Sequence, residues 1–247
     1  VDLSSEIELG RLQQGLQASL EVSWTACPIL GDGERSTAEP LPVRNPADHD
    51  DVVGTVREAD LRDVEAALGM AAAAAPGWAR TPVEDRAGCL ERAADLLEAE
   101  MPALIGLAIR EAGKSIPNAV AEVREAVDFC RYYAAQVRAE FRNETHRALG
   151  PVVCIAPWNF PLAIFVGEVA AALAAGNTVL AKPAEQTPLI AAHAVALLHG
   201  AGVPGDVLAL LPGDGAAVGG RLTADPRVDG VCFTGSTETA RRIERAM

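Results

Sequence analysis

The stretch from Gly150 to Glu185 restricts the fold of this chain more than any other part of the sequence. It begins with an apolar run of strand length, Val152 to Ala156, which meets a Pro-Trp-Asn-Phe-Pro turn and then an uncharged segment of helix length. A second strand-like run, Thr178 to Ala181, follows and ends at Lys182-Pro183. This order predicts a strand, a crossover helix and a second, parallel strand. Ligands bind just beyond the carboxyl ends of such strands, so we expect a binding site there.

The same alternation continues to the end of the chain. Helix-like segments are predicted at residues 162–175, 188–200, 216–223 and 236–246, and strand-like runs at residues 207–211 and 228–233. Short connections between alternating strands and helices are typical of an α/β fold with a Rossmann-like, doubly wound parallel sheet. We therefore expect residues 150–247 to form this sheet domain.

Residues 1–149 have a different pattern, which predicts a helical N-terminal region that packs on the sheet domain. Asp60 is a suitable N-cap for a helix over residues 61–75, and Pro76-Gly77 is expected to end that helix. Further helices are predicted at residues 84–100, 101–112 and 118–140.

The segment before these helices is rich in Pro, Gly and acidic side chains over residues 24–51. This composition favours loop structure. Two short runs, residues 42–45 and 52–56, have the alternation of a hairpin and are expected to pair.

Composition narrows the class of protein. The 247 residues carry a formal net charge of −13, and a surface of that sign repels phosphate groups, which argues against a nucleic-acid partner. The five cysteines are scattered without metal-ligand spacing, which favours a reduced, cytoplasmic protein with no metal site. The uncharged stretch from Ala148 to Gly167 is interrupted by proline, glycine and asparagine and does not predict a membrane span.

Three motifs occur in order along the chain. They are Pro157-Trp158-Asn159-Phe160-Pro161, Lys182-Pro183-Ala184-Glu185-Gln186-Thr187-Pro188 and Phe233-Thr234-Gly235-Ser236-Thr237-Glu238. Together they resemble the aldehyde dehydrogenase superfamily, and the resemblance extends from about Asn45 to the last residue. Within that superfamily the sequence is most similar to L-glutamate γ-semialdehyde (pyrroline-5-carboxylate) dehydrogenase, as it occurs in bifunctional proline utilization A proteins.

Asn159 is the candidate catalytic residue. Aldehyde oxidation through a thiol adduct develops negative charge on the former carbonyl oxygen, and a fixed side-chain NH2 group stabilises such a charge. The simpler interpretation is that an asparagine before Phe-Pro only makes a turn. The resemblance favours the oxyanion role.

Lys182 and Glu185 are candidate cofactor-binding residues, because an ammonium and a carboxylate after a strand are suited to the two hydroxyls of a ribose. The resemblance implies that they hold the adenosine ribose of NAD. The carboxylate would repel a 2′-phosphate, which favours NAD over NADP, although the lysine acts in the opposite direction. The simpler interpretation is a solvated surface loop.

Two glycine-containing turns are further cofactor candidates. At Gly235 and Ser236 the N–H groups of a helix start and the serine hydroxyl are suited to a pyrophosphate, or Ser236 is an ordinary N-cap. The family pattern GxTxxG is incomplete there, because its last position is Ala240. The resemblance assigns Gly215 and Val218 to the wall near the adenine. The remaining cofactor candidates are Ile155, Pro157 and Trp158.

The resemblance also implies an aldehyde tunnel lined by Glu125, Phe160 and Ile164. A carboxylate at position 125 suits a substrate with an α-amino group, such as glutamate semialdehyde. Gly167 stands where enzymes for apolar aldehydes often have a bulky side chain, and we expect the smaller residue to leave room for a polar substrate head.

The catalytic thiol has no candidate in the sequence. Each cysteine falls in a predicted strand or helix or in the N-terminal segment (Cys27, Cys89, Cys130, Cys154, Cys232). By the resemblance, the nucleophile and the general-base glutamate are expected beyond Met247, so that these residues alone have no turnover. The run from Glu111 to Ser115 ends in GKS, but residue 108 is alanine rather than the glycine of a P-loop, so we interpret the run as a glycine-ended helix stop.

These observations lead to one main hypothesis and two alternatives. The main hypothesis is the NAD-binding portion of an enzyme that oxidises L-glutamate γ-semialdehyde to L-glutamate in proline catabolism. The alternatives are an isolated dinucleotide-binding or oligomerisation module without chemistry, and a dehydrogenase for another semialdehyde. The resemblance further implies a homo-oligomer at full length and leaves open a proline dehydrogenase domain in the same polypeptide.

Overall fold

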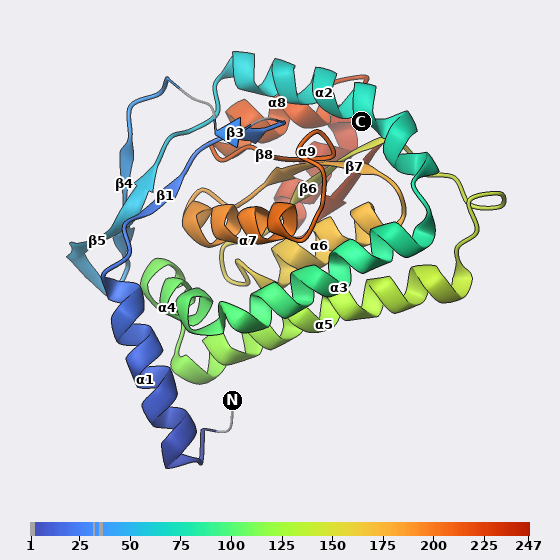
Figure 1. Cartoon of the computed structure of the whole chain (residues 1–247). Coiled ribbons are helices and arrows are strands. Elements are labelled where there is room, and N and C mark those ends of the chain that lie inside the picture. The colour runs from blue at the N-terminus through green and yellow to red at the C-terminus, as the bar shows by residue number, and fades with distance from the viewer. Residues whose placement is uncertain (1–2, 32, 35–36) are drawn as a thin grey trace.

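A computed structural model describes residues 3–31, 33–34 and 37–247 of the chain. Two sheets organise it: a six-stranded sheet with the order β3-β2-β8-β7-β6-β9 and a smaller sheet with the order β1-β5-β4. Figure 1 shows helices on both faces of the larger sheet and the smaller sheet at one side. The predicted α/β class with a doubly wound sheet is confirmed.

Four adjacent parallel strands form one side of the larger sheet, with β9 at its edge. They are β6 (Pro151–Ile155), β7 (Thr178–Lys182), β8 (Leu208–Leu210) and β9 (Gly230–Phe233). The chain moves outward from β6 through β7 to β8, and then returns to place β9 on the other side of β6. The direction of winding therefore reverses between β6 and β9, which is where ligands bind in open α/β sheets.

Alternating side chains of these strands enter two separate cores. Val152, Cys154 and Val179 point to the face covered by the crossover helices α6 (Ala163–Ala174) and α7 (Pro188–Gly200). Val153, Leu180 and Ala209 point to the opposite face, where α2 (Leu61–Arg80) packs together with the π-helical turn η1 (Gly215–Gly219) and α8 (Gly220–Thr223). Burial on both faces explains why these strands are apolar throughout.

The loop prediction for residues 24–51 was incomplete. This region contains β1 (Trp24–Ala26), β2 (Ile29–Leu30) and β3 (Gly33–Glu34). β2 pairs antiparallel with β8, so the larger sheet is mixed rather than wholly parallel. Two-residue strands give too little periodicity to be recognised in the sequence.

Helix α2 also differs from the prediction, because it passes Pro76 and ends at Arg80. It starts as expected at Asp60, whose carboxylate accepts the N–H groups of Arg62 and Asp63 at 2.7 and 2.9 Å. Pro76 is exposed, whereas Trp78, two residues later, is buried and its Nε1–H donates to Leu173 O at 3.1 Å. The tertiary anchor at Trp78 holds the last turn in helical conformation despite the proline.

The remaining long helices surround α6 and α7. They are α3 (Val83–Ala99), α4 (Met101–Ala112) and α5 (Ile116–Glu140), with α9 (Thr237–Ala246) at the end of the chain. In Figure 1, α3 and α5 run side by side below the sheet, and α1 (Glu6–Leu20) extends beside α4. The inner faces of α1, α3, α4 and α5 belong to the same core as α6 and α7, whereas α9 has no buried residue.

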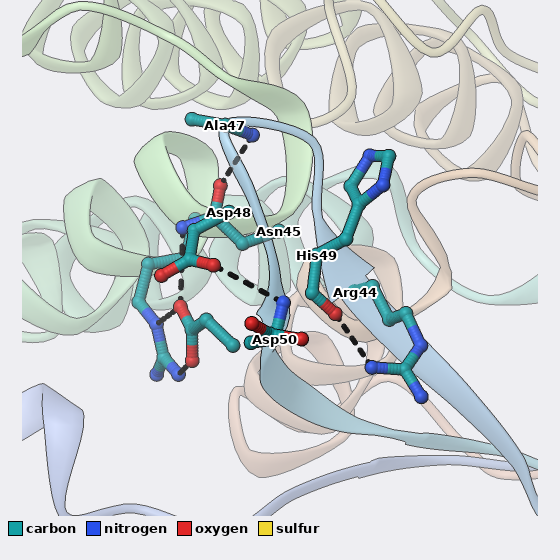
Figure 2. Close-up of polar contacts among 8 residues, drawn as sticks. Arg44, Asn45, Ala47, Asp48, His49 and Asp50 are labelled. Atoms are coloured by element: carbon teal, nitrogen blue, oxygen red, sulfur yellow. Dashed lines mark hydrogen bonds and ion pairs between the residues drawn. The ribbon is translucent and has the colours of Figure 1, made fainter.

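The predicted hairpin is present as β4 (Leu41–Asn45) and β5 (Asp48–Val56), which pair antiparallel. Figure 2 shows the polar contacts of its turn, in which the N–H of Ala47 donates to Asn45 Oδ1 at 2.9 Å. Asp51 joins the hairpin to α4, since Arg110 Nε and Nη2 donate to its two carboxylate oxygens at 3.0 and 2.5 Å. These bonds from Arg110 are the main cause of the lowered pKa of Asp51.

Within residues 3–31, 33–34 and 37–247, no helix is both long and apolar enough to span a membrane.

Candidate active site

The ends of three strands define the position of the site. Ile155 at the end of β6 pairs in register with Lys182 of β7 on one side and with Phe233 of β9 on the other. The chain leaves the sheet at the same level on all three strands, so the following turns meet above a common edge. That edge is the point where the winding of the sheet reverses.

A groove with a volume of about 630 Å³ lies at this edge. It brings together eleven of the residues that the sequence singled out: Ile155, Pro157, Trp158, Asn159, Phe160, Ile164, Lys182, Glu185, Gly215, Gly235 and Ser236. A second cavity of about 520 Å³ adjoins it, shares Ile155, Lys182, Glu185 and Gly215, and continues along α8 and α9. Both volumes lie within the range of cofactor sites in proteins.

Asn159 lies in the turn between β6 and α6 and is exposed. Among the described residues its side-chain amide has no hydrogen-bond partner, and its neighbours Trp158 and Phe160 are 54% and 41% exposed. The Asn159 amide therefore lines the groove, and its N–H groups are not engaged in hydrogen bonds that stabilise the turn.

Lys182 and Glu185 stand at the neighbouring turn. Lys182 is 3% exposed, its Nζ donates to Pro183 O at 2.9 Å, and burial lowers the pKa of the ammonium group while nearby acids, with Glu185 first, oppose this. Glu185 is exposed and its Oε1 accepts the N–H of Gly215 at 2.7 Å. The two side chains thus line the same groove from one strand end, with different degrees of burial.

Gly235 and Ser236 lie where β9 leads into α9. Ser236 Oγ accepts the N–H of Thr239 at 3.1 Å, which is the geometry of an ordinary serine N-cap. Both residues also line the groove, so the N-terminus of α9 opens toward it. The serine cap and an anion site at the same helix end are compatible, because the cap satisfies one N–H group and leaves others of the first turn.

Two predicted residues lie outside this groove lining. Val218 is 2% exposed and belongs to the core under the sheet, so it packs beneath the groove rather than facing it. Glu125 is exposed on α5, one turn after Glu122 and one turn before Phe129. Those two neighbours contact the start and the middle of α6, so Glu125 occupies the α5 face beside the first turns of α6.

The space predicted at Gly167 is filled. A Cβ atom at this position would lie 2.8 Å from the Phe129 ring, which is closer than van der Waals contact. The small residue therefore admits the aromatic ring of α5, and the expectation that it leaves room for a substrate head was wrong.

The five cysteines are placed as the sequence suggested. Four are buried, and Cys232 on β9 is partly buried beside Cys154 on β6, with which it pairs in register. A hydrogen bond from Cys154 lowers the pKa of Cys232 to about 7. Both side chains belong to the core on the α6 face of the sheet, away from the groove at the strand ends.

Sequence reasoning missed three buried carboxylates next to the site. Glu122 accepts the N–H groups that begin α6, and Glu111 accepts those that begin α7. Glu168 on α6 lies beside Thr234, and burial raises its pKa to about 8 although the Thr234 hydroxyl opposes the shift. Glutamates inside helical patterns look like solvated positions in a sequence, so only the fold identifies these three.

The residues present fit a dinucleotide. Gly215 approaches Glu185 so closely that a Cβ atom there would lie 3.2 Å from Glu185 Oε1, and the two adjoining cavities give an elongated space along the edge of the sheet. A cation, a carboxylate and a helix N-terminus stand along it. In the described ranges, groups of three or more metal-ligating side chains are absent.

Fold and groove together define an α/β protein of the Rossmann type with a site at its winding reversal. Residues 34–247 match the model of the aldehyde dehydrogenase family, and the chain belongs to that family. The resemblance inferred from the three motifs is thereby confirmed.

Individual relatives indicate which members of the family the chain is similar to. The chain is 58% identical over 245 residues to the bifunctional protein PutA of Klebsiella aerogenes, covering 99% of this chain and 19% of that protein. It is 40% identical over 259 residues to 1-pyrroline-5-carboxylate dehydrogenase of Anoxybacillus flavithermus, covering 99% of this chain and 50% of that protein. The chain thus spans about a fifth and about half of the lengths of these relatives.

A solved structure agrees with the same relationship. The 1-pyrroline-5-carboxylate dehydrogenase from Thermus with bound NAD superimposes with a TM-score of 0.93 at 34% identity, over 100% of this chain and 50% of that one.

Proposed function

We propose that this chain forms the NAD-binding and oxyanion-stabilising portion of a dehydrogenase that oxidises L-glutamate γ-semialdehyde to L-glutamate in proline catabolism. One observation carries the proposal: Asn159, Lys182, Glu185 and Ser236 come from three different strand ends and line a single groove. The similarity to 1-pyrroline-5-carboxylate dehydrogenases and to bifunctional PutA supports the choice of substrate.

Asn159 is proposed as the oxyanion donor. When a thiolate adds to an aldehyde, the carbonyl oxygen becomes an alkoxide, and a positioned amide N–H stabilises that charge by about 3–4 kcal/mol. The amide of Asn159 is free of other hydrogen bonds among the described residues, so it is available for this task.

Lys182, Glu185 and the start of α9 are proposed to hold the cofactor. Lys182 and Glu185 would bind the two ribose hydroxyls, and the N–H groups near Gly235 and Ser236 would face the pyrophosphate. The carboxylate disfavours a 2′-phosphate, which selects NAD rather than NADP. NAD supplies the hydride acceptor when bound. The structure of the Thermus relative with bound NAD supports this assignment.

The thiol and the general base are proposed to come from outside these 247 residues. The cysteines of this chain are in packed strands, helices or the N-terminal segment, and the partly buried Cys232 faces the core rather than the groove. We therefore expect purified residues 1–247 to show no thiol-dependent NADH formation.

The substrate end of the site is proposed to be formed by Phe160, Ile164 and Glu125. Phe160 and Ile164 line the groove next to Asn159, and Glu125 lies on α5 beside the first turns of α6. A carboxylate there would attract the α-amino group of the substrate. We further propose a proline dehydrogenase part in the same polypeptide, which the similarity to the bifunctional protein PutA supports. The division into residues 1–149 and a cofactor region from residue 150 stays a proposal, because β2, β3 and α2 of the first part complete the larger sheet and its core.

Titration calorimetry with NAD+ tests the proposal. We expect wild-type protein to bind NAD+ and both Lys182→Ala and Glu185→Ala to weaken binding at least tenfold, since each removes a charged hydrogen-bond partner. Asp206→Ala, which removes an exposed acid elsewhere on the surface, is the matched control and should bind normally. Wild-type protein without affinity for NAD+ would refute the cofactor assignment.

A further inference from the structure

A buried ion pair lies behind the turn that carries Asn159. Lys114 Nζ is 2.7 Å from Glu122 Oε1, and the two side chains are only 12% and 1% exposed. Lys114 follows Gly113, which ends α4 in the left-handed conformation with φ +66°, and Glu122 lies in the second turn of α5. The pair therefore connects the end of one helix to the start of the next.

Glu122 also holds the beginning of α6. Its Oε2 accepts the N–H of Leu162 at 3.3 Å and that of Ala163 at 2.9 Å. These are donors that a helix start leaves without intrahelical partners. The carboxylate thus fixes the backbone three and four residues after Asn159.

Lys114 reaches the same turn from the other side. Its Nζ lies 4.1 Å from the centroid of the Phe160 ring, in cation–π geometry. Phe160 follows Asn159 directly and is 41% exposed, so contact with Lys114 is one of the few restraints on this part of the turn. The ion pair therefore touches the turn at its aromatic side chain and at its helical end.

The amide of Asn159 has no hydrogen bond of its own within the described part of the chain. Its position depends on its neighbours in the turn. We propose that Lys114 and Glu122 are positioning residues that hold the Asn159 amide where the oxyanion forms. This inference rests on the proposed function. It gives the buried ion pair a role in the reaction. If the pair holds the amide in place, its loss would displace the amide, and a displacement of a catalytic group by about 1 Å lowers the rate by up to about 100-fold.

The test is steady-state kinetics of Lys114→Met in the full-length enzyme. Methionine keeps an apolar stem over Phe160 and removes the charge. We expect kcat with saturating aldehyde to fall at least tenfold, while KM for NAD+ stays within twofold, because the cofactor residues Lys182 and Glu185 lie on the neighbouring turn. Lys114→Arg, which keeps the cation, should recover most of the lost kcat.

Arg110→Met is the matched control for a merely structural role. Arg110 is in the last turn of the same helix, its side chain is 14% exposed, and it also pairs with a carboxylate, that of Asp51 at 2.5 Å. Its partner belongs to the β4–β5 hairpin, away from the groove. We expect Arg110→Met to lose stability but to keep kcat within twofold of wild type.

The possible results separate the two claims. A wild-type enzyme without NAD+-dependent aldehyde oxidation would contradict the proposed function. An active wild type together with an equally active Lys114→Met would overturn the positioning role, as would equal losses of kcat in Lys114→Met and Arg110→Met. If Lys114→Met fails to fold, Lys114→Gln gives the same comparison, because it keeps a hydrogen-bond donor toward Glu122 without the charge.

Discussion

The turns after β6 and β7 are fixed in the same way, by a buried glutamate that accepts backbone N–H groups, but the two glutamates differ in charge. Each turn carries candidate site residues, and each is followed by a helix whose first free N–H groups donate to a buried glutamate. Glu122 accepts from Leu162 and Ala163 at the start of α6. Glu111 accepts from Leu189 and Ile190 at the start of α7, at 2.6 and 2.9 Å.

The two glutamates differ in their charge partners. Glu122 forms an ion pair with Lys114. Glu111 is 3% exposed, and burial raises its pKa to about 8 although the two backbone N–H groups oppose the shift. The Asn159 turn is therefore held by a charged pair, whereas the turn with Lys182 and Glu185 is held by a carboxyl group that is largely neutral at pH 7. The difference shows that a helix start can be fixed with or without a net buried charge.

The largest expected effect concerns the amide in the first turn. Asn159→Ala in the full-length enzyme should lower kcat by about 100- to 1000-fold, because it removes an oxyanion donor. KM for NAD+ should change little, which steady-state kinetics at varied NAD+ would show. Gln186→Ala removes an exposed amide from the second turn and should keep kcat within about threefold. Similar losses in both variants would contradict the division of roles between the turns.

The second-largest expected effect is a loss of stability, which should differ between substitutions of the two glutamates. Glu122→Gln should lower the free energy of unfolding by about 3 kcal/mol at pH 7, because it leaves the Lys114 ammonium without its anionic partner in a buried place. Glu111→Gln keeps one of the two oxygens that accept the α7 N–H groups and removes no ion pair, so its loss should be smaller, about 1–2 kcal/mol. Urea unfolding monitored by circular dichroism measures both. An equal loss in the two variants would break the comparison.

The pH dependence of stability sharpens the same contrast. The pKa of Glu111 is about 8 in the folded state and has the ordinary glutamate value of 4.5 in the unfolded state. Between these values the folded state retains a proton that the unfolded state has lost, so stability falls as pH rises from about 4.5 to 8 and is level outside that window.

Glu111→Gln should abolish this contribution. Glu168, whose pKa is also about 8, gives wild-type protein a second contribution of the same sign, so the informative quantity is the difference between the wild-type and Glu111→Gln curves. The variant should gain on wild type by about 1–3 kcal/mol from pH 5 to pH 8. A constant difference across that range would show that Glu111 is ionised in the folded protein.

The smallest effect is expected for an ion pair remote from both turns. Asp51→Asn removes the partner of Arg110, and both side chains keep some contact with water, at 28% and 14% exposed. Its cost should be about 0.5–1 kcal/mol at pH 7. Since Arg110 lowers the pKa of Asp51, the stabilisation exists above the unfolded pKa of 3.8 and is lost as pH falls below it. If Asp51→Asn lowered the free energy of unfolding as much as Glu122→Gln, the difference in burial between the two ion pairs would not determine their contribution to stability.

Local signals were sufficient for much of this protein. Continuous apolar runs between turn residues identified β6 and β7, and the residues that end these strands identified the edge at which the groove lies. The same reasoning failed at Pro76, where burial of Trp78 keeps α2 helical, and at β2, whose two residues give no period. It also failed at Gly167, because the ring that fills the space comes from Phe129 on another helix.

The sequence by itself determined the order of strands and helices from β6 onward, the family, and the residue types at each strand end, because these depend on neighbours a few positions apart. The tertiary structure alone decided which turns share a groove and which acids are buried. Glu111 and Glu122 acquire their roles from helices α7 and α6, which lie 78 and 40 residues further along the chain. Burial and charge pairing depend on distances in space, and no local pattern of residues encodes those.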